Sequence, residues 1–138
     1  MNDFLKVHNA IRAKVGVGPM DWNNTLGTYA ENYADSLIKT NCEMVPSRGP
    51  YGENLAKGKS SQTSEQAMMH WASEKANYDY ASNSCTRNGG CDHYTQMVWR
   101  NSIHLGCAIV KCITDSVDLS VVVCSYGPPG NKVGQRPY

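Results

Sequence analysis

The sequence has 138 residues, a length typical of a single domain and sufficient to bury a hydrophobic core. Its 13 basic and 12 acidic side chains nearly cancel, so charge gives no reason to expect nucleic-acid or membrane-surface binding. No apolar run approaches the roughly 20 residues that a membrane-spanning helix needs.

Six cysteines, an even number, predict three disulfide bonds and therefore an oxidising compartment. A zinc site is the alternative, but the sequence has no Cys-x2-Cys pair, and its close pairs are Cys85–Cys91 and Cys107–Cys112. We therefore expect the mature form of a secreted protein from which the leader has been removed.

Two amphipathic helices are predicted near the start of the chain. Apolar residues recur at helical spacing over residues 3–15, and the glycines and proline of residues 16–19 end that helix. His8 lies on its apolar side, where we expect a buried, hydrogen-bonded histidine rather than a metal ligand. A second helix is predicted over residues 24–39, with alanines that allow close packing.

The next segment contains a predicted strand between two irregular stretches. Prolines and a glycine make residues 42–51 irregular. Residues 52–56 predict a short strand that includes Glu53, and a polar loop is expected over residues 57–62.

A third helix and a long loop are predicted after that strand. Thr63 and Gln66 form a capping-box pattern, which predicts a helix over residues 64–75. Residues 77–90 are rich in Asn, Ser and Gly, and they predict a loop closed by a disulfide bond.

The chemically richest stretch covers residues 92–102. Asp92 is expected to cap a helix, which would place His93 in the first turn. The neutral imidazole is favoured there, so His93 can act as an acceptor, a base or a metal ligand. Tyr94 and Met97 recur at helical spacing and predict a core face. A lone histidine in this setting is usually structural, and it forms a site only if acids converge on it.

Two strands, over residues 105–113 and 119–126, follow this helix and are joined by a turn near Asp115–Ser116. The run of three valines at 121–123 has no polar alternation, which indicates a strand covered on both faces. Helices combined with such a strand predict an α+β fold, an α/β/α sandwich.

The turn also predicts how the cysteines pair. It places Cys107 opposite Cys124, which favours a cross-strand bond and leaves Cys42 to pair with Cys112. Each disulfide bond is expected to contribute about 2–4 kcal/mol by restricting the unfolded chain. The expected set is Cys42–Cys112, Cys85–Cys91 and Cys107–Cys124.

The last eleven residues, 128–138, contain three prolines and two glycines and cannot form a regular element. They are either an ordered loop packed on the domain or a detachable peptide. We therefore divide the chain into a domain of residues 1–127 and a tail of residues 128–138.

Residues 92–99 and 121–131 resemble the two signatures of the CAP superfamily, which comprises cysteine-rich secretory, antigen 5 and pathogenesis-related proteins. The resemblance is closest to the plant class-one pathogenesis-related proteins. It extends to residues 52–56, to the spacing of the six cysteines and to the final residues 135–138. It implies an α/β/α sandwich around a central antiparallel sheet.

The family cleft holds two histidines and two glutamates. The resemblance matches Glu53, Glu74 and His93 to three of these positions, but Pro46 stands where the first histidine is expected. One imidazole with two carboxylates is a poor zinc site, so we expect no tightly bound metal and no other cofactor. His93 is the candidate ligand for any zinc that does bind, and His70 is its alternative partner because it shares a helix face with Glu74.

The sequence offers neither a free cysteine nor a serine in a nucleophile-elbow motif, so we expect no enzymatic activity. A hydrolase or metal-dependent enzyme that uses Glu53, Glu74 and His93 is the alternative. The resemblance implies an extracellular protein of the plant apoplast that acts against fungi and oomycetes. It also implies binding of sterols or related lipids and contact with pathogen membrane components, which needs an apolar groove and no metal. We expect a monomer.

The resemblance further implies that a processing protease releases the tail as a defence signal. The released peptide would run from Pro128 to Tyr138 and include Gly130 and Asn131. Family members commonly carry Asn and Asp at the second and fourth of the four residues before the cut, whereas this chain reads Cys-Ser-Tyr-Gly at residues 124–127. An exposed tail beyond the last strand would suit proteolysis.

Overall fold

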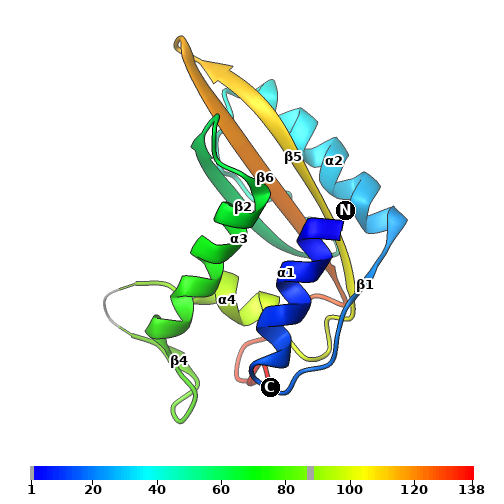
Figure 1. Cartoon of the computed structure of the whole chain (residues 1–138), viewed down its shortest axis with the longest axis vertical. Helices are drawn as coiled ribbons and strands as arrows, with labels where there is room; N and C mark the ends of the chain where they lie inside the picture. Colours follow the sequence, from blue (N-terminus) through cyan, green and yellow to red (C-terminus); the bar gives the residue numbers. More distant parts are fainter. Residues whose placement is uncertain (1, 87–88) are drawn as a thin grey trace.

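The structure, a computed structural model, describes residues 2–86 and 89–138 and has three layers (Figure 1). A four-stranded sheet lies in the middle; α2 covers one face, and α1, α3 and α4 cover the other. The predicted α/β/α sandwich is therefore confirmed. The helices are α1 (Asn2–Ala13), α2 (Asn24–Ile38), α3 (Ser64–Ser73), the 3-10 helix η1 (Glu74–Asn77) and α4 (Asp92–Met97). The strands are β1 (Asp21–Trp22), β2 (Gly52–Lys59), β3 (Tyr78–Asp79), β4 (Ser84–Cys85), β5 (His104–Thr114) and β6 (Val117–Gly127).

The central sheet has the strand order β1-β5-β6-β2. The three long strands are antiparallel, and the register of β5 on β6 pairs Cys107 with Cys124, as the predicted turn requires. The two-residue strand β1 adds a parallel edge to β5, so the sheet as a whole is mixed. This edge forms because the chain entering α2 runs alongside the start of β5, where Asp21 N–H donates to Ile103 O (2.8 Å).

A hydrophobic core lies on each side of the sheet. One joins α1, α3 and α4 to the sheet around Trp71, Tyr94 and Leu105, and the other joins α2 to the opposite face around Ala30 and Ala34. The run of three valines at residues 121–123 of β6 is completely buried, which confirms the strand covered on both faces. Burial on both faces stabilises β6.

Helix α2 packs unusually close to β5. A Cβ atom on Gly106 would lie 2.0 Å from the backbone nitrogen of Gly27, a separation that real Cβ atoms do not reach. Only glycine at Gly106 lets the helix and strand backbones approach this closely. Asn23 starts α2 as its N-cap by accepting the Leu26 N–H through its side chain (3.0 Å).

The three disulfide bonds are Cys42–Cys112, Cys85–Cys91 and Cys107–Cys124, the set expected from the sequence. Helices α1 and α2 and the strands of the β5–β6 hairpin match their predicted ranges to within two residues. The capping box of Thr63 and Gln66 is present at the start of α3. None of the helices in the described residues is both long and apolar enough to cross a bilayer.

Three local predictions differ from the structure. Residues 57–59, expected in a loop, extend β2, because Lys57 and Lys59 pair with Val121 and Leu119 of β6. Helix α3 ends at Ser73 and continues as the tighter helix η1. The expected loop over residues 77–90 contains the short β3–β4 pair, while its residues 87 and 88 lie outside the described residues.

A candidate site in the cleft around His93

The helix that carries His93 is capped by a residue from another element. Asp92, predicted as the N-cap, is the first helical residue; Cys91 holds the cap position and makes no side-chain cap bond. Glu74, at the start of η1, supplies the missing acceptor: its Oε1 accepts the N–H groups of His93 (3.0 Å) and Tyr94 (3.2 Å). These are two of the N–H groups that a helix start leaves without partners.

The same carboxylate orients the His93 ring. Glu74 Oε2 lies 2.7 Å from His93 Nδ1, and the ring stacks on Trp71 with the centroids 5.9 Å apart and the planes 9° apart. With Nδ1 engaged, Nε2 is the nitrogen that remains for chemistry. The His93 side chain is 41% exposed, so this nitrogen can meet an incoming molecule.

Glu53, on β2, also lies in the cleft. Its Oε1 accepts the Ser47 N–H (2.8 Å), whereas Oε2 is buried and has no hydrogen-bond partner among the described residues. Both Glu53 and His93 line a cavity of about 390 Å³. The other lining residues are Met44, Pro46 and Leu55. The cleft therefore brings together Glu53, Glu74, His93 and Pro46, the four residues that the sequence analysis singled out.

The residues of the cleft do not fit a zinc site. Pro46 contributes a wall but no ligand atom, and Glu74 is engaged by the His93 ring and two backbone N–H groups. His93 Nε2 and Glu53 Oε2 remain as candidate ligand atoms. Two protein ligands are fewer than the three or four of zinc sites. In the part of the chain that the structure describes, the one group of three close ligand-type residues includes two cysteines already joined in a disulfide bond.

His70 does not join the cleft. Its side chain is exposed on α3, and among the described residues no hydrogen bond or ion pair connects its ring to Glu74. The helix ends at Ser73, so Glu74 turns toward His93 instead of continuing the face that His70 occupies. The predicted helix through residue 75, on which the pairing of His70 with Glu74 was based, is corrected by the end of α3 at Ser73.

A buried hydrogen-bond chain connects the cleft to α1. His8 Nδ1 lies 2.8 Å from Phe4 O, and its Nε2 lies 2.7 Å from the Tyr126 hydroxyl. Asn54 Nδ2 donates to that hydroxyl (3.1 Å) and to the carbonyl of His93 (3.0 Å). Because the Phe4 carbonyl can only accept, His8 carries its proton on Nδ1 and accepts the Tyr126 O–H at Nε2.

Burial sets the protonation states of the hydrogen-bonded His8 and Tyr126 side chains. It lowers the pKa of His8 from 6.5 to about 4, so the ring is neutral at physiological pH. Burial likewise raises the pKa of Tyr126, which keeps the hydroxyl protonated. The predicted buried, hydrogen-bonded His8 is confirmed, but its partners Tyr126 and Asn54 were not identified from the sequence. No short-range pattern could identify them, because they lie 118 and 46 residues away along the chain.

A second concave region lies between α1 and α3. Two adjoining cavities of about 220 and 270 Å³ share Ile11, Lys14 and Met69 in their walls. The walls combine apolar side chains with the polar residues Asp3, Lys6, Lys14, Glu65, Ser73 and Lys75. The apolar lining residues are Val7, Ala10, Ile11, Val15, Met69, Ala72 and Tyr94. We call this region the α1–α3 groove.

The chain is similar to proteins of known family. A model of the cysteine-rich secretory protein family matches residues 5–126. Pathogenesis-related protein 1 of Arabidopsis thaliana is 50% identical over 136 residues, which cover 99% of this chain and 81% of that protein. The basic form of pathogenesis-related protein 1 of Nicotiana tabacum is 51% identical over 136 residues, which cover 99% of this chain and 74% of that protein.

Solved structures share the fold over almost the whole chain. Na-ASP-1 has a TM-score of 0.79 at 26% identity, and the match covers 99% of this chain and 40% of that longer chain. NaASP2, solved with Zn²⁺, has a TM-score of 0.76 at 26% identity and matches 99% of this chain and 83% of that one. The family model, the relatives at about half identity and the shared fold agree: the chain belongs to the cysteine-rich secretory protein (CAP) family.

Proposed function

We propose that this protein is a secreted plant-defence protein that acts against fungi and oomycetes by binding sterols or related lipids. Its similarity to pathogenesis-related proteins 1 of two plants supports the defence role and the extracellular, apoplastic location. Its three disulfide bonds suit an oxidising compartment. The partners in this proposal are the lipid itself and the pathogen membrane that supplies it.

The observation that supports lipid binding is the α1–α3 groove. Its two cavities together fall within the roughly 300–1,000 Å³ of small-molecule sites. Met69 stands in the wall of both and is 50% exposed, so a large apolar side chain faces solvent where a ligand would cover it. Lys14, which lines both cavities, can meet a polar end of the ligand. Lipid binding by these residues does not require a metal.

A charge placed in the groove tests the proposal. We expect Met69→Asp to weaken binding of a fluorescent sterol at least tenfold while the circular dichroism spectrum stays unchanged, because a carboxylate would be desolvated by the ligand. Ile113→Asp is the matched control: Ile113 is an apolar residue, 72% exposed, near the tip of the β5–β6 hairpin. Equal sterol binding by both variants and the parent protein would reject the groove as the site.

The same variants link binding to defence. The parent protein and Ile113→Asp should inhibit growth of a sterol-auxotrophic oomycete, and Met69→Asp should not. Inhibition that survives the loss of sterol binding would separate the antimicrobial action from lipid capture. Sedimentation equilibrium would test the expected monomer.

An acid–base enzyme in the cleft is the alternative. It is favoured by Glu53, whose Oε2 has no hydrogen-bond partner in the described part of the chain and which lines the same cavity as His93. A variant that combines His93→Ala with Glu53→Gln distinguishes the two functions. We propose that it keeps sterol binding, since neither residue touches the α1–α3 groove. Turnover of a substrate that disappears in this variant would establish the enzyme instead.

Weak or absent zinc binding at the cleft is part of the same proposal, and it follows from the shortage of ligand atoms.

We also propose that a plant protease cuts the Gly127–Pro128 bond and that Pro128–Tyr138 acts as a signal. Mass spectrometry under denaturing conditions, after exposure to apoplastic fluid, tests the cut. If no Pro128–Tyr138 fragment forms, the protein is not a peptide precursor.

A further inference from the structure

The tail is bound along its length by the rest of the protein. At its start, the Ser102 hydroxyl donates to the carbonyl of Pro128 (2.6 Å), and the Gly130 N–H donates to Gln96 Oε1 (3.1 Å). Gln96 and Ser102 are themselves joined by a hydrogen bond of 3.0 Å and are completely or almost completely buried. A rigid, desolvated pair of polar side chains therefore holds the first residues of the tail.

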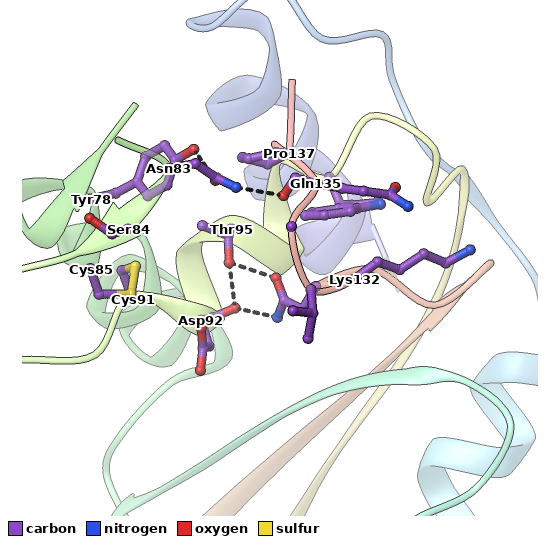
Figure 2. A pocket seen from close by; sticks show the side chains of 14 residues that line it. Tyr78, Asn83, Ser84, Cys85, Cys91, Asp92, Thr95, Lys132, Gln135 and Pro137 are labelled. Atoms are coloured by element: carbon purple, nitrogen blue, oxygen red, sulfur yellow. Dashed lines mark hydrogen bonds between the residues drawn. A yellow bond between two sulfur atoms is a disulfide. The ribbon is translucent and has the colours of Figure 1, made fainter. Parts of the chain in front are cut away.

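The side chain of Asn131 makes the next contacts, with α4. The Thr95 hydroxyl donates to Asn131 Oδ1 (2.6 Å), and Asn131 Nδ2 donates to the carbonyl of Asp92 (2.9 Å) (Figure 2). Thr95 is 6% exposed, so its hydroxyl faces the tail from a buried position. Asn131 adopts φ = 55°, a left-handed conformation that Asn tolerates better than most residues.

The end of the tail is held by backbone and aromatic contacts. The Arg100 N–H donates to the carbonyl of Pro137 (2.8 Å), and Pro137 is buried. The Tyr138 ring stacks on Tyr80 with the centroids 5.3 Å apart, and its hydroxyl lies 3.2 Å from that of Tyr94. Tyr138 is therefore partly buried among aromatic rings.

The loop between β3 and β4 also contacts the tail. Asn83 Nδ2 donates to the carbonyl of Gln135 (3.0 Å), as Figure 2 shows. The Arg136 guanidinium donates to the carbonyls of Tyr80 (3.1 Å) and Ala81 (2.8 Å). This loop and the α4 segment, both distant from the tail in the sequence, thus form one binding site for residues 128–138, which we call the tail site.

The bond before the tail is less accessible than the sequence implied. Tyr126 and Gly127 are buried and paired in β6, where the Gly127 carbonyl accepts the Ile103 N–H (2.9 Å). Proteases cut exposed, poorly held segments, so the end of β6 must open before Gly127 can be bound as a substrate. The contacts that hold the tail do not involve that bond.

We propose that the tail site is a peptide-binding site, so that cleavage alone leaves the peptide bound and release is a separate, slower step. Hydrolysis breaks the Gly127–Pro128 C–N bond; water supplies the hydroxyl of the new Gly127 carboxyl group and the proton on the Pro128 nitrogen. The contacts from the Pro128 carbonyl to Tyr138 remain as they were. Retention of a cut peptide at this site rests on the proposed peptide release. Binding of the tail in the intact protein does not depend on that release.

Hydrogen exchange in the intact 138-residue protein tests the site without any protease. We expect the Gly130 amide to exchange on the order of a hundredfold more slowly than in the synthetic peptide Pro128–Tyr138, because exchange needs the tail to detach. Thr95→Val and Asn131→Gly each remove side-chain hydrogen bonds without straining the backbone, and each should speed this exchange about fivefold. Val133→Ala, at a fully exposed position of the tail, is the control and should change nothing.

Cleaved protein tests retention. After exposure to apoplastic fluid, the peptide should co-elute with the 127-residue body on a native sizing column and separate from it only in urea. The proposal is overturned if the Gly130 amide exchanges as fast as in the free peptide, or if the cut peptide leaves the native column at its own low mass. If the fluid does not cut the chain, the proposed peptide release fails, and the exchange result still decides whether the tail site holds its peptide.

Discussion

Removal of the Glu74 carboxylate should reduce stability, because this group caps α4 and holds the His93 ring. Loss of a helix cap costs about 1 kcal/mol, and a hydrogen bond to a charged group contributes about 1.5–3 kcal/mol. The second figure is reduced here, because the Glu74 and His93 side chains are 17% and 41% exposed and water screens their interaction. We therefore expect Glu74→Ala to lower the free energy of unfolding by about 2 kcal/mol.

Urea unfolding followed by circular dichroism measures this change. Glu74→Gln should lose about half as much, since its amide oxygen still accepts the backbone N–H groups of His93 and Tyr94. Glu43→Ala is the matched control, because Glu43 is exposed and its side chain makes no hydrogen bond among the described residues. If Glu74→Ala costs less than about 0.5 kcal/mol, the typical range for a surface substitution, Glu74 is not the cap that the geometry indicates.

Three further predictions follow from the cleft, the buried histidine and the α2–β5 contact. Calorimetric titration of zinc into the metal-free protein should give no submicromolar affinity; such an affinity, lost in His93→Ala, would contradict the reasoning. Because the pKa of His8 is lowered to about 4, the unfolded chain binds a proton between pH 6.5 and 4 that the folded protein does not. Stability should therefore fall by about 2 kcal/mol from pH 7 to pH 5 through this group, and His8→Gln should lose that part of the urea-monitored pH dependence. Gly106→Ala should cost about 1–3 kcal/mol in the same assay by pushing α2 off β5, whereas Gly18→Ala, with open space around it, should be nearly neutral.

The sequence by itself determined the features that depend on near neighbours. Helical spacing of apolar residues located α1 and α2, and the capping box located the start of α3. The turn near Asp115–Ser116 set the register of β5 on β6 and therefore the pairing of Cys107 with Cys124. These predictions hold because turn geometry and side-chain periodicity act over a few residues.

The tertiary structure decided what depends on contacts between distant segments. Residues 57–59 have the composition of a polar loop, but they pair with β6 and form the end of β2. Helix α3 ends at Ser73, and Glu74 therefore caps α4. The composition of the tail left open whether it is free or packed on the domain. Contacts from α4 and the β3–β4 loop hold it in place. Such groups are drawn together by burial and by the need to satisfy buried polar atoms, and no local pattern in the sequence records which partners they will find.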